Sequence, residues 1–257
     1  MRTATKNKNK FVLTLMFTII IILTLVVVVL VAALMKRPAE EIDPHEGQVY
    51  INDGFGMVWM TPLEGVDVNN ISQSDIVRYD GVPKYVGEGY ETLRGVDVSE
   101  HQYDIDWAAV AASGVDFAYI RLGYRGYTQG GLFEDAYFKA NIEGAKSNGI
   151  KVGVYFFSQA INVQEAIEEA DFVLERIEQY DIDLPVMYDW EKMEEAGADA
   201  RTYQLDTAIL DECAVAFCET VKKAGYEPGV YFNRYIGYYG FDLSRLNSYK
   251  FWLAVPG

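Results

Sequence analysis

The chain has 257 residues, of which 50% are hydrophobic and 23% are charged. This is an ordinary globular composition with room for one large domain or two small ones, and it excludes a chain that is disordered throughout. The two cysteines, Cys213 and Cys218, are too few for a disulfide framework, and we interpret them as small core residues.

The charge is distributed unevenly along the chain. All charged side chains in the first 37 residues are basic, and there are six of them among the 22 basic residues of the chain. The remainder therefore carries 16 basic against 38 acidic side chains, a net charge of −22. Because so acidic a body repels phosphate backbones, we expect no nucleic-acid partner.

The first predicted element is a membrane-spanning helix over residues 11–35, which follows a basic tail at residues 1–10. The run contains no charge, and as a helix it would be roughly 37 Å long, against about 30 Å for the hydrocarbon core of a bilayer. A cleaved signal peptide is the alternative, but its apolar stretch is usually about 7 to 15 residues long and precedes a small-residue cleavage site. Four basic residues before the run and two after it favour a single-pass protein with an extracytoplasmic body.

Residues 36–93 are expected to form a stalk and a small β arm. The acidic, proline-containing residues 38–44 favour a short stalk. Val49–Ile51 and Met57–Met60 flank a glycine-bearing segment, and this pattern predicts a β-hairpin. Residues 61–93 sustain no period, so we expect a linker or a covering arm there.

From Arg94 onward, strand-like runs alternate with helical segments. A helix is predicted after Asn162, which forms a cap signature with Glu165, and two further apolar stripes end at Gly149 and Gly225. The strand-like runs are Gly95–Val98, Asp116–Leu122, Val152–Phe157, Leu184–Trp190, Gly229–Phe232 and Phe251–Val255. This alternation predicts an α/β fold with a parallel sheet and helices packed outside it.

Six predicted strands are present, whereas a closed β/α barrel has eight. We therefore expect a TIM-like β/α barrel of which this chain is a fragment, because an uncovered parallel edge strand is a template for aggregation. The alternative is a sheet that stays open with an unpaired edge.

Candidate catalytic acids lie where the predicted strands end, which is where function gathers in parallel β/α folds. Alternation along Leu184–Trp190 and into the next residue places Asp189 and Glu191 on one face, and Asp97 ends the first predicted strand. Two nearby carboxyls in a partly desolvated pocket cannot both ionise freely, so one holds a proton, as acid-assisted glycoside cleavage requires. The alternative is a pair of solvated acids that begin a loop, since two more glutamates follow.

Other polar and aromatic residues are candidates for substrate binding. Arg121 lies in the second predicted strand and would have to pair with an acid if it faced inward; otherwise it is a rim arginine in water. Tyr155 and Tyr231 occur in matching Gly-Val-Tyr-Phe runs, and tyrosine suits the apolar faces and hydroxyl edges of sugars. Neither His45 nor His101 has a partner at metal-ligand spacing, so we expect no metal and no cofactor.

An ordered set of motifs resembles the glycoside hydrolases of family 25, the Chalaropsis-type lysozymes. The resemblance covers about Arg94 to the end, so residues 94–257 are expected to be an incomplete catalytic domain. The motifs are the run Arg94 to Gln102, Asp135-x-x-Phe138-x-x-Asn141, Gly153-x-Tyr155, Asp189-Trp190-Glu191 and Gly225-Tyr226-x-Pro228-Gly229-x-Tyr231.

The resemblance implies a β/α-barrel muramidase that cleaves the β-1,4 bond between N-acetylmuramic acid and N-acetylglucosamine in peptidoglycan with retained anomeric configuration. At the matching positions Glu191 would be the general acid. Asp189 would stabilise the developing positive charge or orient the acetamido group of the substrate, and Asp97 would assist from the rim.

The resemblance also implies a sugar groove lined by Tyr155 and Tyr231, and we add Arg121 and Trp252 as candidate substrate-binding residues. Family members continue beyond the strand that bears the tryptophan into two further strands that close the barrel, whereas this chain stops at Gly257.

Together these observations predict a peptidoglycan hydrolase in the cell membrane, with glycan strands as its partner and residues 11–35 as its membrane contact. The alternative is a catalytically silent module that binds cell-wall glycan within a surface complex. The sequence carries no sign of an oligomeric state.

Overall fold

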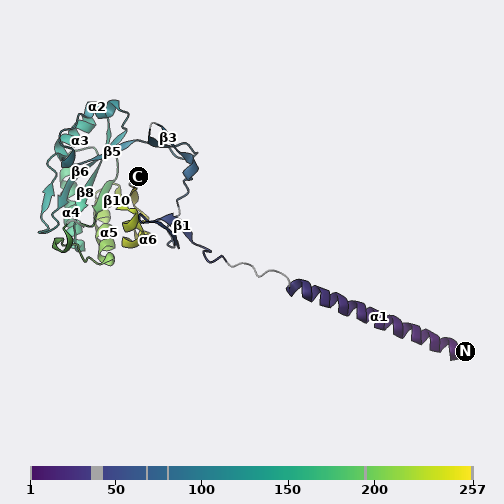
Figure 1. Cartoon of the computed structure of the whole chain (residues 1–257). Helices are drawn as coiled ribbons and strands as arrows, with labels where there is room; N and C mark the ends of the chain where they lie inside the picture. Colours follow the sequence, from purple (N-terminus) through teal and green to yellow (C-terminus); the bar gives the residue numbers. More distant parts are fainter. Residues whose placement is uncertain (1, 36–42, 68, 80, 194–195, 256–257) are drawn as a thin grey trace. The chain divides into compact units, whose positions relative to one another are not determined.

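The computed structural model describes residues 2–35, 43–67, 69–79, 81–193 and 196–255. It divides into two compact units, Met1–Glu46 and Gly47–Gly257 (Figure 1). The described part of the first unit is mainly one helix, α1 (Arg2–Met35). By length and composition its stretch Lys10–Ala33, with a mean hydropathy of 3.3, is suited to cross a membrane. The predicted stalk at residues 38–44 lies mostly outside the described residues.

Two small antiparallel hairpins precede the main sheet in the second unit. The strands β1 (Val49–Asn52) and β2 (Met57–Met60) pair with each other, which confirms the predicted hairpin. The strands β3 (Ile76–Tyr79) and β4 (Val82–Tyr85) form a second hairpin within the stretch predicted to be a linker or covering arm. The sequence did not reveal this hairpin because its strands are four residues long and mostly exposed, so they show no apolar period.

The main sheet contains six parallel strands in the order β11-β10-β9-β8-β6-β5, and β7 (Leu132–Glu134) pairs antiparallel with β6. All six predicted runs are confirmed as strands, with ends shifted by at most three residues, whereas β7 was not predicted. The parallel strands are β5 (Gly95–Val98), β6 (Phe117–Arg125), β8 (Lys151–Ser158), β9 (Val186–Trp190), β10 (Pro228–Asn233) and β11 (Lys250–Ala254).

The sheet is curled into a half-barrel. Trp252 of β11 stacks on Tyr119 of β6, with 4.7 Å between ring centroids, although three strands lie between β11 and β6 in the sheet. A flat sheet would hold these strands well over 10 Å apart, because neighbouring strands are about 4.8 Å apart. The predicted TIM-like arrangement is therefore confirmed for the six strands that the structure describes.

Helices cover the outer face of this sheet (Figure 1). The helix α3 packs against β6 and β8, α4 against β8, and α5 against β9 and β10. The helices of the second unit are α2 (Trp107–Ala112), α3 (Phe138–Ser147), α4 (Val163–Ile177), α5 (Thr207–Lys223) and α6 (Leu243–Leu246). The predicted cap is present, since the side chain of Asn162 accepts a hydrogen bond from the amide of Glu165 at 3.0 Å.

The hydrophobic core lies between the helices and the outward side chains of the strands. Ile120, Val154 and Val230 are fully buried there. Both cysteines are buried on α5 with free thiols, which confirms that they are core residues. Alternation along the strands sends other side chains, among them Tyr119, Asp189 and Trp252, to the concave interior.

Candidate active site

The strand β9 carries the predicted acid pair to the carboxyl end of the sheet. All five of its residues are buried. Its outward residue Tyr188 packs on Phe217 of α5 with 5.3 Å between ring centroids, so Asp189 faces the interior and is 6% exposed. The register places Asp189 beside Tyr231 of β10, and Glu191 follows directly after the strand.

The interior environment favours the neutral form of Asp189. Burial is the main cause that raises its pKa well above the ordinary value, followed by the negative charge of Glu191; Arg121 acts in the opposite sense, and Asp97 adds a smaller rise. Among the described residues, Oδ1 of Asp189 is buried without a hydrogen-bond partner. The fold thus brings Asp97, which lies far earlier in the sequence, close enough to affect Asp189 together with Glu191.

The three acids differ in their surroundings. Glu191 is half-buried, and Asp97 lies exposed on the edge strand β5. Burial, the charges of Glu191 and Asp189, and a hydrogen bond with Glu191 raise the pKa of Tyr231. Asp189, Glu191 and Tyr231 therefore form the centre of the site, with Asp97 at its rim.

Arg121 faces inward and is paired with two acids, as an interior arginine requires. Its Nε lies 2.7 Å from Oδ2 of Asp135, and its Nη2 lies 2.9 Å from Oε1 of Glu100. The buried Asp135 also accepts a hydrogen bond from the amide of Glu100 at 2.9 Å. The sequence reading predicted that an inward Arg121 would need an acid but did not identify these partners, although both lie in motifs that carry the family resemblance.

Aromatic rings fill the interior next to the acids. Trp252 stacks on Tyr119 and makes edge contacts with Tyr231 at 5.0 Å and with Tyr155 at 6.0 Å. A cavity of about 350 Å³ lies between the edge strands β5 and β11, and Asp97, Tyr119 and Trp252 are among its lining residues. The predicted residues Tyr155, Tyr231 and Trp252 are thus in one cluster, to which the structure adds Tyr119.

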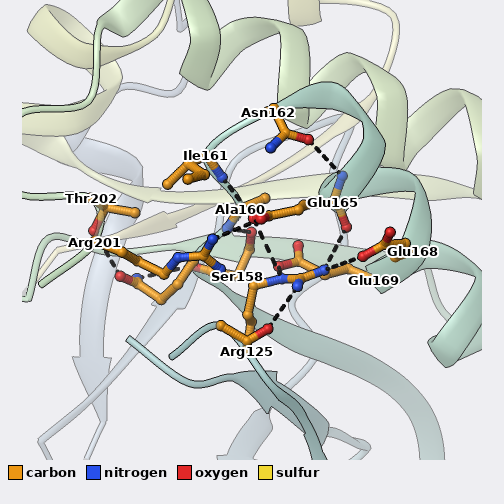
Figure 2. A network of polar contacts seen from close by, with 12 residues as sticks. Arg125, Ser158, Ala160, Ile161, Asn162, Glu165, Glu168, Glu169, Arg201 and Thr202 are labelled. Atoms are coloured by element: carbon orange, nitrogen blue, oxygen red, sulfur yellow. Dashed lines mark hydrogen bonds and ion pairs between the residues drawn. The ribbon is translucent and has the colours of Figure 1, made fainter. Parts of the chain in front are cut away.

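A second polar cluster lies at the carboxyl ends of β6 and β8, against α4 (Figure 2). Nε of Arg125 is 2.7 Å from Oε1 of Glu169, and Nη2 of Arg201 is 2.7 Å from Oε1 of Glu165. Burial raises the pKa of Glu169 to about 7, against the opposing effects of Ser158 and Arg125. Sequence analysis missed this cluster because Arg125 and Glu169 are 44 residues apart.

In the part of the chain that the structure describes, no group of three or more His, Cys, Asp or Glu side chains is arranged to hold a metal ion. The side chains described at the site are carboxyls, one paired arginine and aromatic rings.

A curled parallel sheet with helices on its outer face is the architecture of the β/α-barrel class, in which active sites lie at the carboxyl ends of the strands. The family model "Glycosyl hydrolases family 25" matches residues 96–255. The chain belongs to glycosyl hydrolase family 25, which confirms the resemblance seen in the sequence.

Curated relatives agree with this assignment. Lysozyme M1 of Streptomyces globisporus is 35% identical over 80 residues, which are 31% of this chain and 25% of the relative. The autolytic lysozyme of Clostridium acetobutylicum is 34% identical over 68 residues, which are 26% of this chain and 19% of the relative. The chain thus matches a quarter or less of the length of these two proteins.

Solved structures share the fold. The modular autolysin LytC of Streptococcus pneumoniae aligns with a TM-score of 0.52 and 27% identity, over 82% of this chain and 48% of that one. The bacterial lysozyme of Streptomyces coelicolor aligns with a TM-score of 0.53 and 24% identity, over 66% of this chain and 76% of that one.

Proposed function

We propose that this protein is a membrane-anchored N-acetylmuramidase that hydrolyses the β-1,4 bond between N-acetylmuramic acid and N-acetylglucosamine in peptidoglycan with retention. The observation that supports this most is the position of Asp189 and Glu191 at the carboxyl end of β9, next to the aromatic rings of Tyr155, Tyr231 and Trp252. Membership of family 25 and the lysozyme relatives support the same substrate class.

In this proposal Glu191 donates a proton to the departing sugar oxygen and Asp189 stabilises the positive charge on the ring or orients the acetamido group. A neutral Glu191, which is the form that donates, no longer places a negative charge beside Asp189 and so favours the ionised form of Asp189. The negative charge of the ionised Asp189 then stabilises the positive charge of the oxocarbenium-like transition state.

The neighbouring groups support the pair. The positive charge of Arg121 favours the ionised form of Asp189, while Glu100 and Asp135 hold the guanidinium in place. Tyr155, Tyr231 and Trp252 offer ring faces and hydroxyl groups for sugars. Asp97 assists from the rim of the cavity.

The membrane part of the proposal rests on α1. Residues 1–10 form a cytoplasmic tail, 11–35 span the membrane, 36–93 form the stalk and arm, and 94–257 form the extracytoplasmic catalytic domain. The acidic body gives no attraction to an anionic wall, so the anchor rather than charge keeps the enzyme near its substrate.

The experiment compares the full chain in detergent micelles with Glu191→Gln and Asp189→Asn, using two substrates. On peptidoglycan glycan strands we expect both variants to release reducing ends at least about 100-fold more slowly, because each loses a group that acts in the transition state. On an aryl glycoside, whose leaving group needs no proton, we expect Glu191→Gln to recover much of its rate and Asp189→Asn to stay slow.

Two results would contradict the proposal. Equal losses of both variants on the aryl glycoside would reject the assigned roles. Binding of glycan strands without release of reducing ends by the full chain, unchanged in Glu191→Gln, would instead identify a catalytically silent binding module.

A further inference from the structure

The backbone of Glu191 lies one residue beyond the sheet. The last register pair between β8 and β9 is Ser158 with Trp190. Glu191 therefore needs another support if its carboxyl is to keep a fixed position at the end of the strand.

Gln159, the residue after β8, provides that support. Its side chain is 0% exposed, and its Nε2 donates a hydrogen bond to the backbone carbonyl of Glu191 at 2.9 Å. Its Oε1 accepts a hydrogen bond from the hydroxyl of Thr202 at 2.7 Å. One buried amide thus connects the first residue of the segment between β9 and α5 with Thr202 near its end.

The amide of Gln159 is held at each of its polar atoms. Its Nε2 donates a second hydrogen bond, to the carbonyl of Ser158 at 2.9 Å, so both donors and the acceptor are engaged. Because the group is fully buried, loss of one partner would leave a polar atom without a hydrogen bond, and the amide would move to find another.

Thr202 is itself fixed by its neighbour. Arg201 pairs with Glu165 of α4 through Nη2 at 2.7 Å, and its amide donates to the carbonyl of Tyr127 at 2.8 Å. Figure 2 shows Arg201 and Thr202 next to the carboxyl end of β8 and the start of α4. A series of contacts therefore connects α4 through Arg201, Thr202 and Gln159 to the backbone of Glu191.

We propose that Gln159 is a positioning residue for Glu191 and that the hydroxyl of Thr202 keeps the Gln159 amide in its working orientation. This inference rests on the proposed role of Glu191 as proton donor. A misplacement of about 1 Å lowers the rate of an enzyme by up to about 100-fold. Because Glu191 is the proton donor in this proposal, we expect a displaced Glu191 to slow the chemical step rather than to weaken substrate binding.

The test uses the full chain in detergent micelles and three variants. Thr202→Val removes the hydroxyl donor with little change of shape, and Thr202→Ser restores it. Thr220→Val is the matched control, because the half-buried Thr220 hydroxyl also donates one hydrogen bond, to Ala216 within α5, far from Glu191 in the sequence.

With soluble peptidoglycan fragments we expect Thr202→Val to lower kcat about 10-fold and to change KM less than about twofold. Thr202→Ser should recover at least half of the wild-type kcat, and Thr220→Val should match the wild type. Unchanged kcat in Thr202→Val, or a loss that Thr202→Ser does not recover, would overturn the proposal.

A second readout needs no activity. Lys192 is exposed directly after Glu191, so the rate of tryptic cleavage after Lys192, measured by mass spectrometry, reports how firmly this end of the segment is held. We expect Thr202→Val to raise this rate several-fold over the wild type and Thr220→Val. If the wild type releases no reducing ends, the proposed function fails, while an unchanged cleavage rate in Thr202→Val would reject the positioning role.

Discussion

The raised pKa of the buried Glu169 carboxyl predicts how the free energy of unfolding depends on pH. Its side chain is fully buried beside Arg125, yet burial outweighs the arginine and raises the pKa from 4.5 to about 7. A raised pKa in the folded state means that the folded protein binds a proton more tightly than the unfolded chain does. The resulting stabilisation is complete below the unfolded pKa and is lost as the pH rises through about 7.

The magnitude follows from the two pKa values. A rise from 4.5 to about 7 corresponds to about 3 kcal/mol over the whole window. About 2.5 kcal/mol of this falls between roughly pH 5 and pH 8 by linkage. The free energy of unfolding of the wild type should therefore decrease over this range by that amount relative to a variant that cannot titrate here.

The variant is Glu169→Gln, which keeps an oxygen for Arg125 and carries no ionisable group. Urea unfolding of the full chain in detergent micelles is followed by tryptophan fluorescence, since all four tryptophans lie after Gly47. Glu168→Gln is the matched control, because Glu168 lies 3.3 Å from the same arginine but its side chain is 49% exposed. Parallel pH curves for the wild type and Glu169→Gln, within about 0.5 kcal/mol, would refute the reasoning.

Two further predictions concern the candidate active site. Asp189→Asn should remove activity, and its free energy of unfolding should rise above that of the wild type as the pH rises from 5 to 8. The reason is that burial and Glu191 raise the pKa of Asp189 and so oppose its charged form in the folded protein. Urea titrations at both pH values would show this, and a variant less stable than the wild type at pH 8 would contradict it. Arg121→Met should lower the free energy of unfolding by about 3–5 kcal/mol, since it leaves Asp135 buried without its ion pair. Restoring about half of that loss by adding Asp135→Asn would support this cause, whereas additive losses in the double variant would argue against it.

Much of the architecture was predictable from local patterns. Alternating strand and helix periods predicted all six parallel strands, and the Asn162 cap predicted the start of α4. Alternation along β9 placed Asp189 and Glu191 on one face because the side-chain direction in a strand depends only on sequence parity. The ordered motifs were sufficient to predict the family.

Other features depend on residues that only the tertiary structure brings together. Arg121 needed an acid, but its partners Glu100 and Asp135 come from separate segments, and the exposed strands β3 and β4 had no apolar period to reveal them. The same holds for the contact of Gln159 with Glu191, which are 32 residues apart.

The sequence by itself therefore determined the six parallel strands and which faces of these strands carry acids, because both depend on spacing along the chain. The tertiary structure decided which charges are paired, which amide supports the backbone of Glu191, and that the raised pKa belongs to Asp189. These properties depend on burial and on distances across the fold, and spacing along the chain contains neither.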